Sequence, residues 1–123
     1  MRKLLLVATL AILAAPAASA KDGAQAHLLR PLPSHPAEGT MITIRWTVTV
    51  PGAGGKREPF GATGMFVKLI GRNHASTTAT APQKHGPPYS VRIRVPRGGI
   101  RAVRFGLHGW NDYGPGDMYF PLK

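Results

Sequence analysis

The feature that most constrains this chain is an unbroken alternation of apolar and polar residues over positions 41–50, Met-Ile-Thr-Ile-Arg-Trp-Thr-Val-Thr-Val. Successive side chains of a β-strand point to opposite faces, so one face of this segment is apolar and the other polar. Most of its residues are β-branched or aromatic, types that fit a pleated sheet. The segment predicts a half-buried strand with Trp46 at the centre of the core. The apolar face contains Ile42, Ile44, Trp46, Val48 and Val50.

Shorter segments of β character follow, separated by turns rich in glycine and proline. Strands are predicted at residues 63–72, 75–81, 89–95, 100–108 and 118–122, and residues 27–36 are predicted to form a short edge strand with an extended continuation. The second face of 63–72 is only partly polar, which predicts a strand covered on both sides. The turn at 96–99 predicts that 89–95 and 100–108 form a hairpin, while 51–59 and 109–116 are predicted loops. These features predict an all-β, antiparallel immunoglobulin-like β-sandwich of about seven strands, with an open barrel as the alternative.

The N-terminal residues have the pattern of a secretory signal peptide. Arg2 and Lys3 precede an apolar run over residues 4–15, and Ala18-Ser19-Ala20 supplies the small residues that signal peptidase recognises. The run is shorter than the roughly 20 apolar residues that cross a bilayer, and no second hydrophobic segment follows. We therefore expect an exported protein, with an uncleaved N-terminal anchor as the alternative. The expected divisions are a signal peptide at 1–20, a flexible linker at 21–26 and a folded domain at 27–123.

Composition narrows the chemistry of this domain. The chain has no cysteine, which excludes disulfides and thiolate chemistry. An exported domain without disulfides is held together by packing alone, and this favours a bacterial source. Removing Arg2 and Lys3 with the signal peptide lowers the formal net charge from +11 to +9. Such an excess of positive charge favours anionic partners.

Four groups of residues resemble, in order and spacing, the YtkA-like group of small exported bacterial domains. They are Ile-Thr-Ile-Arg-Trp-Thr-Val at 42–48, Pro-Phe-Gly-Ala-Thr-Gly-Met-Phe-Val-Lys-Leu at 59–69, Tyr89 with the strand that ends in Val-Pro-Arg-Gly-Gly-Ile at 95–100, and Asp-Met-Tyr-Phe-Pro at 117–121. The resemblance covers most of residues 21–123. It implies an immunoglobulin-like fold outside the cytoplasm and no established activity.

A second resemblance is to copper-resistance proteins of the CopC type, which share a sandwich fold and a mature N-terminal histidine. Here Ala24-Gln25-Ala26 forms a second small-x-small cleavage site directly before His27, whose amino group and imidazole would then chelate copper. His108 is the second candidate ligand. A copper-binding or metallochaperone-like protein is therefore the alternative function, and solvated loop histidines are the simpler interpretation. Further candidate ligands for the same copper site are His35, His74 and His85.

Few residues outside the signal peptide are suited to catalysis. A glycosidase needs two carboxylates held across a sugar, and Asp112 with Asp117 is the candidate pair, although turn capping also explains both residues. No serine lies in a nucleophile elbow, and no glycine-rich loop leads into a helix to hold a phosphate. We therefore expect that the protein is not an enzyme, with a weak hydrolase as the third alternative.

Arginines on the predicted hairpin are the clearest candidates for binding. Arg92 and Arg94 share the outer side of its first strand, Arg101 and Arg104 come from the returning strand, and Arg97 lies in the turn. Their guanidinium groups would attract an anionic surface polymer or an acidic protein of the cell envelope. A simpler explanation is that they keep a sheet soluble and prevent edge pairing. Nucleic acid is not expected, because aromatic residues do not interleave with these cations.

Trp110 and Tyr113 in the loop at 109–116 are the second candidate contact. Loops at the end of a sandwich often carry binding, and the two rings would stack on a sugar or on a partner's side chain. The alternative is that Trp110 covers the end of the core. The sequence thus predicts a non-enzymatic binding or accessory module at the bacterial envelope, with copper as the one cofactor under consideration.

Overall fold

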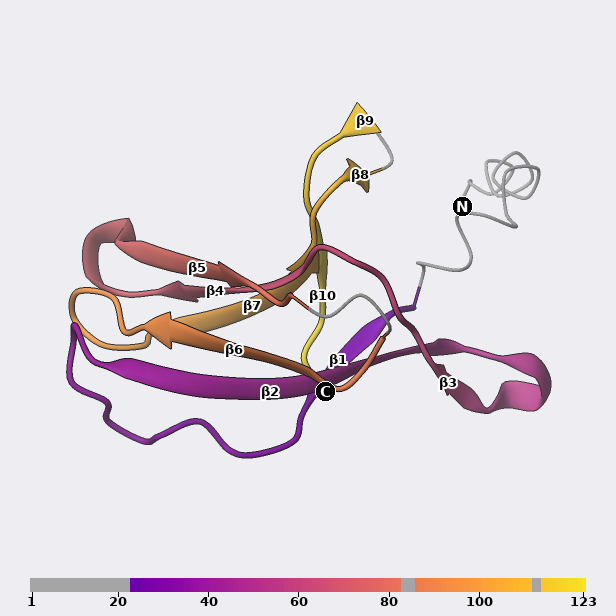
Figure 1. Ribbon diagram of the computed structural model, residues 1–123, viewed down its shortest axis with the longest axis horizontal. Helices are drawn as coiled ribbons and strands as arrows, with labels where there is room; N and C mark the ends of the chain where they lie inside the picture. The colour runs from indigo at the N-terminus through magenta and orange to yellow at the C-terminus, as the bar shows by residue number, and fades with distance from the viewer. Residues whose placement is uncertain (1–22, 83–85, 112–113) are drawn as a thin grey trace, which may run out of the picture.

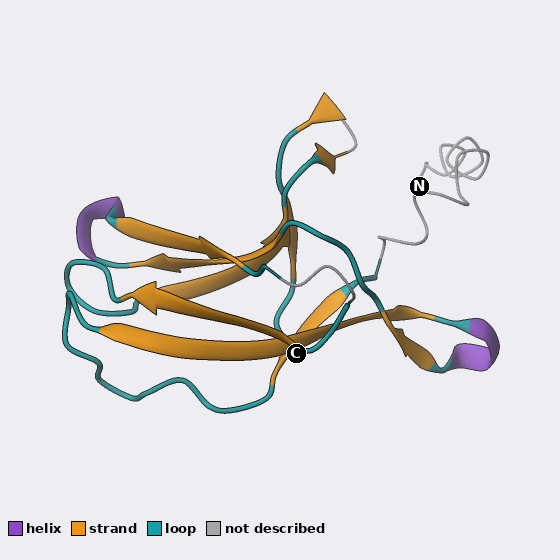
Figure 2. Cartoon of the chain, in the orientation of Figure 1, coloured by secondary structure: helices purple, strands orange, loops and turns teal. Residues whose placement is uncertain are grey.

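The computed structural model describes residues 23–82, 86–111 and 114–123. These residues form two antiparallel sheets packed face to face as a β-sandwich, with a small hairpin standing at one end (Figure 1). Strands and loops make up the architecture, apart from short helical turns (Figure 2). The prediction of an all-β antiparallel sandwich is therefore confirmed. Outside the described residues lie the predicted signal peptide at 1–20, His85, Asp112 and Tyr113.

The first sheet is organised around β2 (Met41–Pro51), the strand that the alternation predicts. β2 pairs antiparallel with the three other strands of this sheet. These are β1 (Gln25–Leu28), β3 (Arg57–Pro59) and β6 (Tyr89–Arg94). Ile44, Trp46 and Val48 are buried whereas Arg45 is exposed, so the predicted division of β2 into an apolar and a polar face is confirmed.

The second sheet has the strand order β10-β7-β4-β5 and is antiparallel throughout. Its strands are β4 (Met65–Ile70), β5 (Ser76–Thr80), β7 (Ala102–Leu107) and β10 (Met118–Phe120). Between β7 and β10, β8 (Trp110–Asn111) pairs with β9 (Gly114–Pro115), so the predicted loop at 109–116 is partly a hairpin. The helical turns are η2 (Ala53–Gly55) and η3 (Arg72–His74). Among the described residues, no helix is long and apolar enough to cross a membrane.

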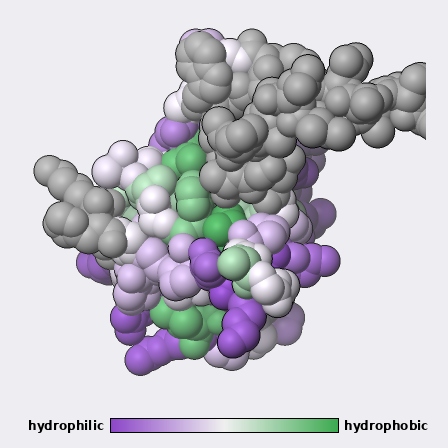
Figure 3. Space-filling model, turned by 90° about the vertical axis from the view of Figure 1, so that its right-hand side faces the viewer, coloured by the Kyte–Doolittle hydropathy of each residue, from purple (hydrophilic) through white to green (hydrophobic). Residues whose placement is uncertain are grey.

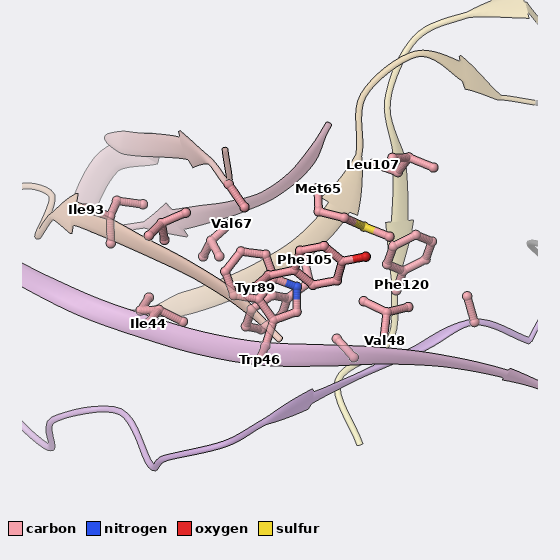
Figure 4. Packing of buried hydrophobic residues seen from close by; sticks show 14 of the residues in the cluster. Ile44, Trp46, Val48, Met65, Val67, Tyr89, Ile93, Phe105, Leu107 and Phe120 are labelled. Carbon is pink, nitrogen blue, oxygen red and sulfur yellow. The ribbon is translucent and has the colours of Figure 1, made fainter. Parts of the chain in front are cut away.

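The core between the sheets is centred on Trp46, as predicted (Figure 4). The fully buried indole has its ring centroid 5.5 Å from that of Tyr89 and 5.3 Å from that of Phe105. The Tyr89 hydroxyl donates to the Phe60 carbonyl at 3.0 Å and accepts from the Ala62 N–H at 3.1 Å. The indole N–H of Trp46 has no hydrogen-bond partner among the described residues. Within the described residues, packing and not a hydrogen bond therefore holds the indole in place.

The predicted hairpin of residues 89–95 and 100–108 is wrong, because its two strands belong to different sheets. β6 pairs with β2, whereas β7 pairs with β4 and β10. Each strand has one apolar face, and placing the strands in opposite sheets lets these faces meet in the core. A hairpin would turn both apolar faces to the same side. Because a glycine turn permits either connection, the local sequence does not distinguish between them.

The predicted flexible linker, residues 21–26, is wrong at its C-terminal half, where β1 begins. Ala24 and Ala26 are buried. The Ala26 N–H donates to the Pro121 carbonyl at 2.9 Å, and its carbonyl accepts from the Lys123 N–H at 2.9 Å, which joins the two sheets along this edge. Alanine permits this close approach of two backbones. Small residues are also typical of linkers, so composition alone gave the wrong assignment.

The predicted loop at 51–59 is largely a β-hairpin arm, formed by the end of β2 and by β3, that extends away from the sandwich (Figure 1). Gly54 at its tip has a positive φ of 70°, which glycine adopts without strain. The Arg57 guanidinium donates to the Thr49 carbonyl at 2.8 Å and to the Gly23 carbonyl at 2.6 Å. These bonds tie the arm to the residues that precede β1.

Candidate functional site

The outer face of the first sheet carries three exposed arginines, Arg45 on β2 and Arg92 and Arg94 on β6, which we call the basic face. In the register of the sheet, Arg92 lies opposite Thr43, and Arg45 lies opposite Ser90. Arg92 is therefore a diagonal neighbour of Arg45, at a typical Cα separation of about 7–8 Å, and is two residues from Arg94 on the same strand. Three positive charges are thus held close together on one rigid surface.

The charges of the basic face have no carboxylate partner among the described residues. The one ion pair there joins His108 and Asp117, on the opposite side of the sandwich. Arg94 donates from Nη1 to the Gly39 carbonyl at 2.7 Å, a contact that fixes the side chain without neutralising it. The side chains of Arg45 and Arg92 make no hydrogen bond among the described residues. Like charges at neighbouring positions of a sheet destabilise it, and an anionic ligand would remove that cost.

Two of the four arginines predicted to act together lie elsewhere. Arg101 is exposed where the chain has just crossed to the second sheet, and its N–H donates to the Ile70 carbonyl at 2.8 Å. Arg104 lies on the outer face of the second sheet, opposite Lys68. The predicted set of Arg92, Arg94, Arg101 and Arg104 is therefore divided between two faces, because the hairpin on which it depended does not form. The strand next to β6 is β2, so Arg45 and not Arg101 or Arg104 is the neighbour of Arg92.

On the outer face of the second sheet, Phe66 is buried from solvent. It points away from the core between the sheets, because its neighbours in β4 point into that core. Its side chain is 1% exposed. The His108 ring stacks on it with a centroid distance of 4.1 Å and an angle of 11°, and the Tyr119 ring meets it edge-on at 5.6 Å. We call Phe66, His108 and Tyr119 the aromatic cluster. The prediction that this strand is covered on both sides is thereby confirmed.

Gly106 allows the Phe66 ring to lie flat on the sheet. The two residues are paired across β4 and β7. A Cβ atom at position 106 would lie 2.6 Å from Cζ of Phe66, closer than carbon atoms approach one another. The guanidinium of Arg104 in turn lies 5.7 Å above the Tyr119 ring. The aromatic cluster is therefore a small second core on the outer surface.

Two hydrogen bonds hold the His108 ring in its position over Phe66. Nδ1 lies 2.7 Å from Oδ1 of Asp117, and Nε2 lies 3.0 Å from Oγ1 of Thr80. A carboxylate only accepts, so Nδ1 carries a proton, and in the neutral imidazole Nε2 then accepts from the threonine hydroxyl. The chain of bonds connects β5 with the ends of β7 and β10.

This order of hydroxyl, imidazole and carboxylate is also that of a serine-hydrolase triad. Here the hydroxyl belongs to Thr80 on an edge strand, and the side chains of His108 and Asp117 are 39% and 41% exposed. Water weakens such electrostatic contacts, whereas triads operate where water is excluded. Cross-linking of strands is the role that this geometry supports. Asp112, the proposed catalytic partner of Asp117, lies outside the described residues.

The structure does not bring the candidate copper ligands together. The Nε2 atom of His27 lies 2.8 Å from Oγ1 of Thr49, on the outer face of the first sheet, whereas His108 belongs to the second. His35 is exposed in the segment between β1 and β2, and His74 lies in η3. Residues 23–82, 86–111 and 114–123 contain no group of three or more His, Cys, Asp or Glu side chains that could hold a metal ion. Cleavage after Ala26 would also remove the first half of β1.

The predicted aromatic loop forms, in part, the β8–β9 hairpin between β7 and β10. Trp110 belongs to β8, and Tyr113 lies outside the described residues. The base of the hairpin is closed by the bond from the Gly116 N–H to the Gly109 carbonyl and by the His108–Asp117 pair just outside it. In the view of Figure 3, hydrophobic surface appears in two areas, one near the centre and one near the bottom, with hydrophilic side chains between them. The hairpin therefore lies, along the chain, between two members of the cluster, His108 and Tyr119.

Sequence reasoning missed the residues of the second outer face as a group. Two signals were present: a phenylalanine at an outward position of β4, and a glycine in the interior of β7, which often marks a close approach. Neither signal shows which residues cover Phe66, because His108, Tyr119 and Thr80 come from three other parts of the chain.

In comparisons with known proteins, no family model, curated protein or solved structure matched this chain. The resemblances to the YtkA-like and CopC-type groups, and the immunoglobulin-like assignment, therefore stay predictions.

Proposed function

We propose that this protein is an exported, non-enzymatic binding module that holds an anionic polymer of the bacterial cell envelope on the basic face. The observation that carries the proposal is the register of β2 with β6, which groups Arg45, Arg92 and Arg94 without a carboxylate partner among the described residues. The signal-peptide pattern of residues 1–20 supports export. The excess of positive charge supports an anionic partner.

A polymer suits this face better than a small anion does. The arginines are exposed on a sheet surface and are not gathered in a pocket, so each one offers a weak contact that water and salt reduce. Several such contacts to repeated charges on one chain add together. Thr43 and Ser90, the cross-strand partners of the arginines, lie on the same face and add hydroxyl groups for hydrogen bonds.

The test is retention on a dextran sulfate resin during a salt gradient. The variant R45Q/R92Q/R94Q is compared with R72Q/R97Q/R101Q, which removes the same charge from exposed positions at the turn end of the sandwich. We expect the native protein and the control variant to elute at similar salt concentrations, and the basic-face variant to elute markedly earlier. Equal elution of the two variants would show that only net charge matters and would remove the proposal.

Export has its own measurement, the mass of the mature protein recovered from its host. We expect an N-terminus at Lys21. A protein that starts at Met1 in the cytoplasm would contradict export, and one that starts at His27 would restore the amino-terminal copper site.

A further inference from the structure

We infer that the outer face of the second sheet is a second binding site, for a neutral carbohydrate chain, built on the exposed rings of the aromatic cluster. This site goes beyond the proposed function: it lies on the opposite face of the sandwich and uses none of the basic-face arginines. Its contact groups are Tyr119, His108, Asp117 and Arg104.

The two rings are exposed and already fixed in place. Tyr119 is 44% exposed, yet its ring contacts Phe66 on one side and the Arg104 guanidinium on another. His108 is held by stacking on Phe66 and by one hydrogen bond at each ring nitrogen. Side chains that are ordered before binding lose little conformational entropy when a ligand arrives. The buried Phe66 is thus the support that keeps both rings in position.

The chemistry of the face matches that of a sugar. A pyranose presents an apolar face of C–H groups and an edge of hydroxyls, so it needs flat apolar surface beside polar groups. Tyr119 and His108 supply the surface, the Asp117 carboxylate accepts from hydroxyls, and Arg104 donates to them.

The charges of this face select against other ligands. The Asp117 carboxylate repels a polyanion and so offsets part of the attraction of Arg104 and Lys68, whereas the basic face has no carboxylate partner among the described residues. An apolar peptide segment would desolvate Asp117, Arg104 and Lys68 without replacing their hydrogen bonds with water, which is costly. A neutral polyhydroxylated chain avoids both penalties.

The test is titration of the ¹⁵N-labelled domain with chitohexaose, cellohexaose and maltohexaose at millimolar concentrations. We expect at least one of these sugars to shift amide resonances of β4, β7 and β10 and to leave those of β6 unchanged. Y119A should weaken that binding by at least about tenfold, because an aromatic anchor is lost. L29A is the matched control, since Leu29 is also an exposed apolar side chain but lies beside Arg45 in the first sheet, and it should bind as the native protein does. Binding of none of the three sugars, or equal binding by Y119A and L29A, would overturn the inference.

Two further variants separate recognition from folding and from the proposed function. D117N keeps the size of the side chain, and we expect it to weaken sugar binding several-fold with the sheet intact, as judged from the β4 and β7 amide resonances. R45Q/R92Q/R94Q should bind the sugar normally, and binding should not change between low and high salt. If R45Q/R92Q/R94Q lost sugar binding, the sugar site would depend on the basic face, and the inference of a separate site would be overturned. If the variant lost dextran sulfate binding but kept sugar binding, both proposals would be supported.

Discussion

The two outer faces of the sandwich are covered by different kinds of side chains. The first sheet is covered by hydroxyl-bearing and arginine side chains that stay hydrated, as Thr43, Arg45 and Arg92 show. The second sheet instead seals Phe66 beneath His108 and Tyr119, so that apolar packing continues on its outer side. The first face therefore adds charge and little stability, and the second adds stability and shape. The experiments below test this difference, from the largest expected effect to the smallest.

Replacement of Phe66 by alanine should give the largest effect. Its side chain is as buried as the core residues, and truncating a buried phenylalanine costs about 3–5 kcal/mol. Thr43→Ala, at the centre of the first outer face, should change the free energy of unfolding by less than about 0.5 kcal/mol. Urea denaturation measures both. Similar, small values for the two variants would mean that the second face is not a second core.

Gly106→Ala tests the same core from the opposite strand. The added methyl group collides with the Phe66 ring and with the Met118 carbonyl, and overpacking of this kind costs about 1–3 kcal/mol. In the double variant with Phe66→Ala, the collision with the ring is removed, so the combined loss should be smaller than the sum of the single losses. Strict additivity in urea denaturation would contradict the contact between residues 66 and 106.

Tyr89, which lies between the sheets, should make stability fall at alkaline pH. Burial raises the pKa of its hydroxyl above the usual 10.0, and the Ala62 N–H opposes the shift. The unfolded chain then ionises at a lower pH than the folded one, so this contribution is complete below pH 10 and is lost as the pH rises through the folded pKa. Tyr89→Phe should remove this part of the pH dependence while costing about 1–2 kcal/mol at neutral pH, from two lost hydrogen bonds. Equal slopes of unfolding free energy between pH 9 and 11 would count against the buried hydroxyl.

Arg92→Gln should give the smallest effect and the opposite sign. Removing one of three neighbouring positive charges relieves repulsion, so we expect stabilisation by a few tenths of a kcal/mol at low salt. Because salt screens exposed charges, the gain should vanish near 1 M salt. Thermal unfolding of the native protein and of Arg92→Gln, at low salt and near 1 M salt, measures this gain in stability. A loss of stability would indicate a structural contact for Arg92 and weaken the contrast between the faces.

The sequence predicted well the properties that depend on neighbours along the chain. Alternation alone identified β2, its buried face and the central position of Trp46, because side-chain direction in a strand follows from position. The partly polar outer face of β4 correctly indicated cover on both sides. These features need no knowledge of which strands pair.

The sequence failed where the answer depends on distant pairing. Arg92 and Arg104 were assigned to one face because a glycine turn connects their strands, yet those strands join different sheets. Ala26 was assigned to a linker, because nothing in its local sequence shows that Pro121 and Lys123 close over it. The same limit hid the aromatic cluster, whose members come from β4, β10 and the end of β7.

The backbone contacts at Ala26 also determine how the domain responds to force. At this edge β1 runs parallel to the segment after β10, as the Ala26–Leu122 bridge shows, and two bonds of 2.9 Å join them. Tension applied between Gly23 and Lys123 pulls parallel neighbours in opposite directions along their length. Both bonds are then loaded in shear and must break together. A force that pulled the two strands apart from one end would instead break the bonds one at a time. A molecule tethered at one end and pulled at the other would therefore keep its sheets together until the two hydrogen bonds at Ala26 break.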